Sequence, residues 1–478
     1  GEDGTAQSQP LYLGKFQVKE TQFPHGMVDT GENVTNVELV YAGQEVEVTE
    51  TSASFYNQRQ KALVTLDKVL EQDETFGIGM NGKISAVTFG LYAQEDITAA
   101  DGSVIPADGL LEIVSVNENG QAVCSTDLPF GSFYLKELST DSHYLLNGET
   151  FPFTFEYGGP SIAVVEISAN DGEAVTNELI RGEIKGLKTD ENGTGLGGAV
   201  IGLFQSDETE FTAENALATT TSADDGSFSF TNVPYGDWVL KELESPEGFI
   251  LSDEVIPVTV EEDGQVVEIS LANERVYGDL RLTKVDKDYP DNKLTGAEFE
   301  VYRDTNGNKE LDEGDELLGK LEETSTGIYE MSHILYGGVF VRETKAPEGF
   351  LLDENAYYVE ITENGKIYEV ENEAGIGFTN MAQTGSLRIE KTSSDGKVEG
   401  FSFRVTGANG YDQTFKTDKN GEIFIEGLRV GDYTVSEVAD GASANYVLPA
   451  DKKVTILADK TTVAQMHNEL RDTPKTGD

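Results

Sequence analysis

Three polar side chains that could react with one another recur along this chain in a fixed order. Each occurrence places a lysine, then a glutamate, then an asparagine at the ends of separate strand-like segments. The four sets are Lys68, Glu137 and Asn177; Lys188, Glu242 and Asn273; Lys284, Glu343 and Asn380; and Lys391, Glu437 and Asn468. Burial would favour a neutral, nucleophilic lysine amine and a neutral glutamic acid. Such a pair could join the lysine to the asparagine carboxamide as an isopeptide bond, with release of ammonia.

The residues around each set predict that these side chains point into a core. Side chains alternate between the two faces of a strand. In the segment GDWVLKE, Trp238 and Leu240 therefore share a face with Glu242. The same parity holds around the other glutamates and around the lysines, and it favours Lys188 over the nearby Lys185. Buried charged groups are rarely unpaired, so the three side chains of a set are expected to contact each other.

A simpler interpretation exists for each residue taken alone. A lysine at a strand end can extend its amine to solvent, a glutamate can pair with it, and an asparagine can form a turn. Four sets that repeat both the order and the parity are hard to explain in this way. The repetition therefore favours the reactive interpretation.

The same landmarks predict an all-β chain built as a tandem array of immunoglobulin-like β-sandwich domains. Period-two alternation and tight turns such as Asp225-Gly226 are typical of antiparallel strands. We expect domains at residues 61–182, 183–277, 278–383 and 384–471, named repeats 1 to 4. Residues 1–60 hold only Glu20 and Asn57 of a set, which predicts the C-terminal part of a truncated domain, and residues 472–478 form a tail.

These motifs resemble the Cna-B family, which comprises the B-type repeats of Gram-positive collagen adhesins and the related SpaA-type pilin domains. The matching features are the opening strand that ends in lysine, the closing strand with asparagine, and the glutamate box followed by SPEGF (245–249) or APEGF (346–350). The resemblance covers nearly the whole chain and implies a transthyretin-related sandwich. It also implies that lysine, glutamate and asparagine are the nucleophile, the acid–base catalyst and the acceptor of an autocatalytic isopeptide bond. Repeats 1 and 4 depart from the pattern because neither has the PEGF turn.

The last residues, RDTPKTGD, resemble the LPxTG sorting signal, which sortases cleave between threonine and glycine. The matching pair is Thr476 and Gly477, whereas Thr473 replaces the usual leucine. We expect the apolar span and basic tail of such a signal to lie beyond residue 478. The resemblance implies sortase and cell-wall peptidoglycan as partners, and an extracellular location with covalent anchoring to a Gram-positive cell wall. A plain polar tail is the alternative.

Composition restricts the class of partner and the kind of cross-link. The chain has 34 Lys and Arg against 87 Asp and Glu, a net charge of -53, which argues against nucleic acid as a partner. Its single cysteine, Cys124, leaves no intramolecular disulfide. No apolar run approaches the roughly 20 residues of a membrane helix.

One acidic segment spaces its oxygens like a calcium loop. The candidate ligands are Asp304, Asn306, Asn308, Asp312 and Asp315. Lys309 stands where that pattern has glycine, and acidic loops are common in so acidic a chain. The segment is therefore either a calcium-binding loop or a plain acidic loop. The proposed bond chemistry requires no cofactor.

Together these features predict the structural stalk of a cell-wall-anchored adhesin or pilin-like protein, without enzymatic turnover. One alternative is that the domains themselves bind a host matrix protein or glycan, or form a pilus subunit. A pilus shaft is disfavoured because Tyr289 and Pro290 are followed by Asp291 instead of a lysine. A second alternative is that they are accessory modules of a secreted carbohydrate-active enzyme.

Overall fold

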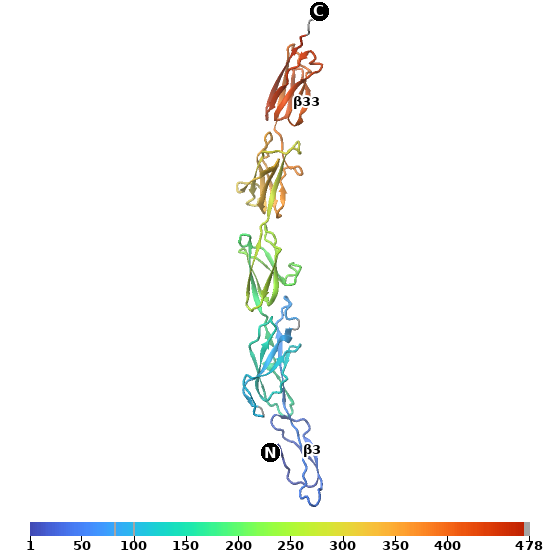
Figure 1. Cartoon of the computed structure of the whole chain (residues 1–478), viewed down its shortest axis with the longest axis vertical. Helices are drawn as coiled ribbons and strands as arrows, with labels where there is room; N and C mark the ends of the chain where they lie inside the picture. The colour runs from blue at the N-terminus through green and yellow to red at the C-terminus, as the bar shows by residue number, and fades with distance from the viewer. Residues whose placement is uncertain (81–82, 99–100, 473–478) are drawn as a thin grey trace, which may run out of the picture. The chain divides into compact units, whose positions relative to one another are not determined.

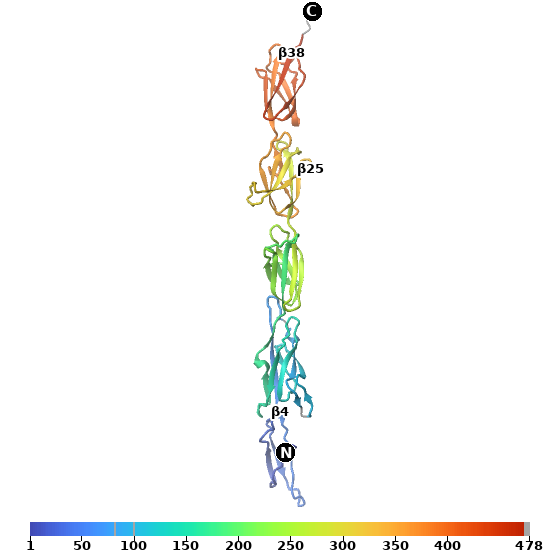
Figure 2. The ribbon, with the colours of Figure 1, turned by 90° about the vertical axis from the view of Figure 1, so that its left-hand side faces the viewer.

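The protein consists almost entirely of β-strands. The computed structural model describes residues 1–80, 83–98 and 101–472. Regular structure in these ranges comprises strands and short 3₁₀-helices, with no α-helix, as Figure 1 and the rotated view of Figure 2 show. The predicted all-β class is therefore confirmed. None of the helices in the described ranges is long and apolar enough to cross a membrane.

The segment before repeat 1 forms two small antiparallel sheets. β1 (Gly14–Lys19) pairs with β3 (Val34–Leu39), and β2 (Met27–Val28) pairs with β4 (Gln58–Arg59).

Repeats 1 and 2 each place their longer strands in two main sheets. Repeat 1 contains β5 (Lys61–Leu70), η1 (Lys83–Ala86), β6 (Thr88–Ala93), β7 (Ile97–Thr98), β8 (Val104–Ile105), β9 (Leu110–Ser115), β10 (Gln121–Val123), β11 (Gly131–Ser139), β12 (Thr150–Phe155), β13 (Val164–Ser168), η2 (Ala169–Gly172) and β14 (Val175–Asn177). Its main sheets have the orders β10-β5-β13, with β14 also paired to β5, and β12-β11-β6-β9, while β7 and β8 form a small hairpin. Repeat 2 contains β15 (Arg181–Asp190), β16 (Val200–Gln205), β17 (Ala218–Thr221), β18 (Ser227–Pro234), β19 (Gly236–Glu244), β20 (Val255–Val260) and β21 (Val266–Asn273). Its sheets have the orders β18-β15-β21 and β17-β16-β19-β20.

Repeats 3 and 4 follow the same plan. The first strand of repeat 2 begins two residues before the expected boundary, and that of repeat 3 begins one residue before it. Repeat 3 contains β22 (Tyr277–Asp286), β23 (Glu298–Arg303), β24 (Glu316–Lys320), β25 (Glu322–Ser325), β26 (Ile328–Leu335), β27 (Gly337–Lys345), β28 (Ala356–Ile361), β29 (Ile367–Glu369) and β30 (Phe378–Asn380). Its sheets are β25-β26-β22-β29, with β30 also paired to β22, and β24-β23-β27-β28. Repeat 4 contains β31 (Thr384–Ser393), β32 (Ser402–Thr406), η3 (Ala408–Gly410), β33 (Asp412–Lys416), β34 (Glu422–Arg429), β35 (Gly431–Val438), β36 (Tyr446–Val447), β37 (Lys452–Ile456) and β38 (Thr461–Leu470). Its sheets are β34-β31-β38-β36 and β33-β32-β35-β37.

Strand pairing brings the lysine and asparagine of a set onto one sheet. The lysine lies on β5, β15, β22 or β31, and the neighbouring strand β14, β21, β30 or β38 carries the asparagine. Where the register is described, the two strands run parallel and the lysines pair with Val175, Phe378 and Met466. Each asparagine is two residues beyond that partner, so it shares the face of the lysine.

The glutamate comes from the second sheet. It lies on β11, β19, β27 or β35, which are interior strands of antiparallel sheets. Each of these strands begins with a glycine at positive φ, between 112° and 154°, where a side chain would be strained. This conformation accounts for the glycine that opens the sequence motif.

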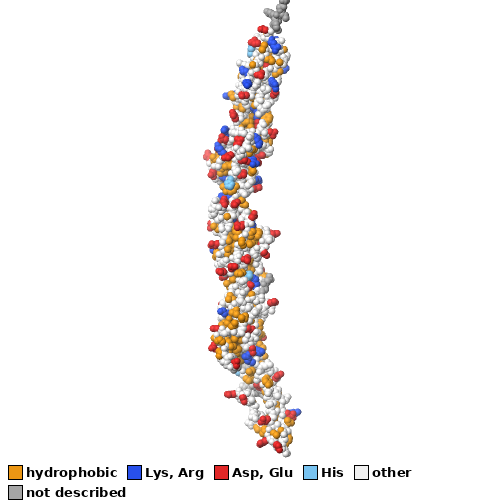
Figure 3. All heavy atoms as spheres, in the orientation of Figure 1, with side chains coloured by type: hydrophobic (Ala, Val, Ile, Leu, Met, Phe, Trp, Pro, Cys, Tyr) orange, Lys and Arg blue, Asp and Glu red, His pale blue; other side chains and the backbone are white. Residues whose placement is uncertain are grey.

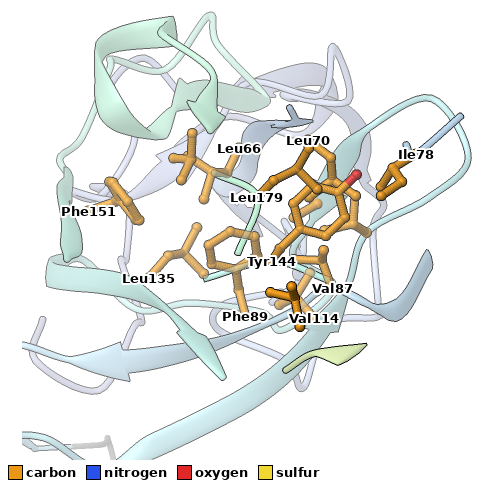
Figure 4. Close-up of a cluster of buried hydrophobic side chains, with 14 of the residues drawn as sticks. Leu66, Leu70, Ile78, Val87, Phe89, Val114, Leu135, Tyr144, Phe151 and Leu179 are labelled. Atoms are coloured by element: carbon orange, nitrogen blue, oxygen red, sulfur yellow. The ribbon is translucent and has the colours of Figure 1, made fainter. Parts of the chain in front are cut away.

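The core lies between the two sheets of each repeat. Figure 4 shows this for repeat 1, where Leu66 on β5, Phe89 on β6, Leu135 on β11 and Phe151 on β12 pack in one cluster. All four side chains are buried. The outer surface is rich in carboxylates, which Figure 3 shows spread over the visible face.

Candidate functional site

All twelve side chains of the four predicted sets are buried. The lysines and asparagines are at most 3% exposed and the glutamates at most 8%. Uncompensated charges at such depth are costly, so the contacts that each side chain makes decide its protonation and reactivity.

Repeat 1 brings its three residues into direct contact. The Lys68 Nζ atom donates to Asn177 Oδ1 at 2.8 Å and lies 3.9 Å from Glu137 Oε1. The Asn177 amide nitrogen donates to both Glu137 oxygens, at 2.9 and 3.0 Å. The amine therefore faces the amide oxygen, and the carboxylate faces the nitrogen that would leave as ammonia.

Repeat 3 repeats the contacts of the glutamate, but Asn380 Oδ1 has no hydrogen-bond partner among the described residues. The Asn380 amide nitrogen donates to both Glu343 oxygens at 2.9 Å, and Lys284 Nζ lies 3.8 Å from Glu343 Oε1. The same amine donates to the Phe378 carbonyl at 3.2 Å and lies 5.2 Å from the centre of the Phe378 ring. Lys284 is therefore held beside the strand that carries Asn380.

In repeat 2 the lysine and glutamate also form a buried ion pair. The Lys188 Nζ atom lies 3.7 Å from Glu242 Oε1 and 3.4 Å from the carbonyl oxygen of Leu271, to which it donates. Asn273 is buried and ends β21, two residues after Leu271. This position corresponds to that of the asparagines in repeats 1 and 3.

Repeat 4 is assembled differently. The Asn468 amide nitrogen donates to one Glu437 oxygen, Oε1, at 2.6 Å. The Lys391 amine donates to the Thr392 carbonyl at 2.6 Å and lies 4.3 Å from the centre of the Phe401 ring. No ion pair within 4.0 Å joins Lys391 to Glu437 in the part of the chain that the structure describes.

Burial shifts the ionisation of these groups in the direction that the bond chemistry needs. Desolvation lowers the pKa of Lys68 and of Lys284 to about 8, from the usual 10.5, although a nearby glutamate opposes the shift. Desolvation also raises the pKa of Glu343 and of Glu437 above the usual carboxyl value. These shifts bring the pKa values of the amines and of the carboxyl groups closer to physiological pH, which favours the neutral amine and the neutral acid.

The lowered lysine pKa predicts a pH-dependent stability when the bond cannot form. In an Asn380→Ala variant, Lys284 keeps its buried amine but has no acceptor. Between pH 8 and 10.5 the unfolded chain binds more protons than the folded one, so the free energy of unfolding of repeat 3 should rise with pH. The expected increase, measured by urea unfolding, is on the order of 3 kcal/mol. The double variant Asn380→Ala/Lys284→Met should lose this increase, and a flat profile in the single variant would contradict the assignment.

The remaining predicted positions lie outside the four sets. In the N-terminal segment, the Asn57 amide donates to Glu20 Oε1 at 2.9 Å, and both residues are partly exposed. Thr476 and Gly477 lie outside the described residues.

The predicted calcium loop is organised by its own hydrogen bonds. Asp304 accepts from the backbone N–H groups of Gly307 and Lys309, and Asp315 accepts from those of Thr305 and Asp312. The side chains of Asn306 and Asn308 both donate to Asp312 Oδ2, at 2.9 Å. Within the described ranges, no cluster of three or more histidine, cysteine or acidic side chains is arranged to hold a metal. Calcium binding by this loop stays a prediction.

One feature of the site was missed at the level of sequence. In repeats 1 to 3 the second glutamate oxygen accepts a backbone N–H from the loop after the glutamate strand, at Asn147, Ser252 and Asp353. Each donor lies ten residues after its glutamate. The constant ten-residue spacing could have indicated these donors. A backbone N–H group is present in every residue except proline, however, so the side-chain types do not reveal it.

Comparison with known proteins agrees with this fold. The family model described as SpaA, a prealbumin-like fold domain, matches residues 182–275, 278–374 and 385–470. No curated protein matches the chain.

Several solved structures are similar to this chain at low identity. The Bacillus anthracis TIE protein is 20% identical with a TM-score of 0.50, over 84% of this chain and 73% of that one. BcpA, the major pilin subunit of Bacillus cereus, is 14% identical with a TM-score of 0.31, over 61% of this chain and 100% of that one. GBS52, the minor pilin of Streptococcus agalactiae, is 18% identical with a TM-score of 0.20, over 42% of this chain and 99% of that one. The expected resemblance to SpaA-type domains is confirmed, and because the matched copies cover more than half of the chain, this protein belongs to the SpaA prealbumin-like fold family.

Proposed function

We propose that this chain is the stalk region of a Gram-positive surface adhesin or pilin-like protein, stiffened by Lys–Asn isopeptide bonds within its repeats. The observation that carries the proposal is the site of repeat 1, where Lys68 Nζ, Asn177 and Glu137 contact one another in a buried position.

The proposed reaction balances without a cofactor or an oxidant. Glu137 takes a proton from the Lys68 ammonium, and the neutral amine attacks the carboxamide carbon of Asn177. A new carbon–nitrogen bond forms, the bond to the asparagine nitrogen breaks, and that nitrogen leaves as ammonia after receiving protons through Glu137. The reaction occurs once per site, so no turnover is expected.

The position of the bond suits a load-bearing role. It would join two neighbouring strands, β5 and β14, through residues 109 positions apart in the chain. If it acts like a disulfide that closes a loop of this length, it stabilises the repeat by about 4 to 5 kcal/mol. Unlike a disulfide, it would not be broken by reduction.

The setting of the stalk follows from the same proposal. Sortase and cell-wall peptidoglycan are the expected partners of the C-terminal tail, which would anchor the chain outside the cell. A host matrix protein, a glycan or another pilus subunit would then be bound by a region that the stalk presents. The high negative charge favours solvation and keeps neighbouring chains apart.

Intact mass spectrometry of the purified chain tests the proposed bonds. Each bond removes one ammonia, so the measured mass should be lower than the sequence mass by at least three ammonias. Peptide mapping should then find Lys68 linked to Asn177. A Lys68→Arg variant should lose one of these deficits, while Lys185→Arg, on an exposed position of β15, should lose none. A mass equal to that of the sequence would refute the proposal.

A further inference from the structure

The loop after each glutamate strand supplies a group that contacts the carboxylate. Backbone N–H groups of Asn147, Ser252 and Asp353 donate to the Oε2 atom of the glutamate in their own repeat, at 2.6, 2.9 and 2.9 Å. A backbone donor of this kind depends on the path of the loop and not on the side chain. Asn, Ser and Asp can therefore all provide it.

An aromatic residue fixes where this donor lies. Tyr144, Phe249 and Phe350 each form a β-bridge with the residue two positions after the asparagine of the set, and the donor follows three residues later. In repeat 4 the corresponding pair is Tyr446 and Leu470, which are register partners of β36 and β38.

The same position in repeat 4 is occupied by a proline. The loop between Glu437 and Tyr446 is two residues longer than in the other repeats, and the third residue after Tyr446 is Pro449. Proline has no backbone N–H, so it cannot donate to the carboxylate. In agreement, Glu437 Oε2 has no hydrogen-bond partner among the described residues although it is buried.

The other contacts of the repeat 4 site also differ from those of repeats 1 to 3, as expected when the backbone N–H donor to the glutamate is missing. Asn177 and Asn380 donate to both oxygens of their glutamates, whereas Asn468 donates to one. Lysines of repeats 1 to 3 lie 3.7 to 3.9 Å from the glutamate, whereas no ion pair within 4.0 Å joins Lys391 to Glu437 among the described residues. The backbone hydrogen bond to one carboxylate oxygen orients the other oxygen toward the lysine. A carboxylate without this hydrogen bond is not held in that orientation.

We infer that this backbone N–H positions the glutamate for bond formation, and that repeat 4, which carries Pro449 in its place, forms its bond more slowly than repeats 1 to 3. The inference rests on the proposed function, because it concerns the rate of the same reaction. It makes the loop after the glutamate strand a part of the reactive site.

Cell-free synthesis of the full chain, with peptide mapping of each repeat over time, tests the inference within one molecule. The bond of repeat 4 should lag those of repeats 1 to 3 by about tenfold, which corresponds to about 1.4 kcal/mol in activation free energy. Pro449→Ala should remove the lag. Ser252→Pro should slow repeat 2 alone, while Ser252→Ala, which keeps the N–H, should not. Thermal unfolding of each variant checks that the repeats are folded.

The pH profile separates positioning by this N–H from a general change in stability. A donor restored by Pro449→Ala favours the ionised Glu437, so the acid side of the rate profile of repeat 4 should move to lower pH. The charged groups that act on Glu437 are Lys391 and Asp440, and both are unchanged in this variant. Equal rates in all four repeats, or a Pro449→Ala variant with an unchanged rate and profile, would overturn this inference but not the proposed function. Absence of cross-links from every repeat would also contradict the proposed function.

Discussion

Replacement of Glu343 by glutamine should leave repeat 3 without its cross-link while the other repeats still form theirs. Glutamine keeps the size of the side chain but cannot take the proton of Lys284, whose amine lies 3.8 Å from Glu343 Oε1. Glutamine also cannot pass a proton to the amide nitrogen of Asn380, so that nitrogen does not leave as ammonia. The mass deficit relative to the variant's own sequence mass should shrink by one ammonia, and repeat 3 should lose about 4 to 5 kcal/mol of stability. Mass spectrometry and thermal unfolding measure the two effects.

A matched control for this variant lies in the same repeat. Glu322 is exposed on β25 and belongs to no set, so Glu322→Gln should change neither the mass deficit nor the melting transition. The chain has several repeats, and its unfolding is not expected to be a single two-state transition. The transition of repeat 3 should therefore be assigned by limited proteolysis. A bond that still forms in Glu343→Gln would show that Glu343 is not the acid–base group.

Truncation of Phe299 should strongly destabilise the core of repeat 3. Its ring is fully buried and lies 5.1 Å, centre to centre, from the rings of Tyr329 and Phe378. Phe299→Ala should destabilise the repeat by about 3 to 5 kcal/mol, because it removes a large apolar group and leaves a cavity. The Phe378 ring also flanks the Lys284 amine, so the bond should form more slowly. Chemical unfolding and the time course of the mass deficit measure these effects.

Leu317→Ala is the control for the core variant. Leu317 lies on β24 of the same repeat and is 51% exposed, so its truncation should alter stability by less than about 0.5 kcal/mol. Similar losses in the two variants would mean that repeat 3 is not held together by the core described above.

Much of the fold follows from local patterns. Period-two alternation predicts strands, and the parity of Trp238, Leu240 and Glu242 predicts the buried face that the structure has. The opening glycine of the glutamate box is likewise explained by its positive φ. These features depend on the alternation of a single strand and on the conformation of a single residue, which a sequence displays directly. The predicted domain boundaries and the bond itself stay predictions.

Other features of the site depend on contacts between distant segments. The two-residue offset between the partner of Lys284 and Asn380 comes from the parallel register of β22 and β30. The lack of an ion pair within 4.0 Å between Lys391 and Glu437 in the described residues is likewise not visible in the sequence, where this set has the same order and parity as the others. The sets of repeats 3 and 4 consist of the same residue types, but the packing around them differs.

The order of the four sets, their inward-facing parity and the array of β-domains all follow from the residue order. Which atoms meet depends on tertiary packing. Parity is a property of one strand, whereas the approach of Lys68 to Asn177 depends on how two strands pair and how two sheets pack. The importance of Pro449 likewise emerges only from the pairing of Tyr446 with Leu470, which aligns Pro449 with the backbone donors of the other repeats.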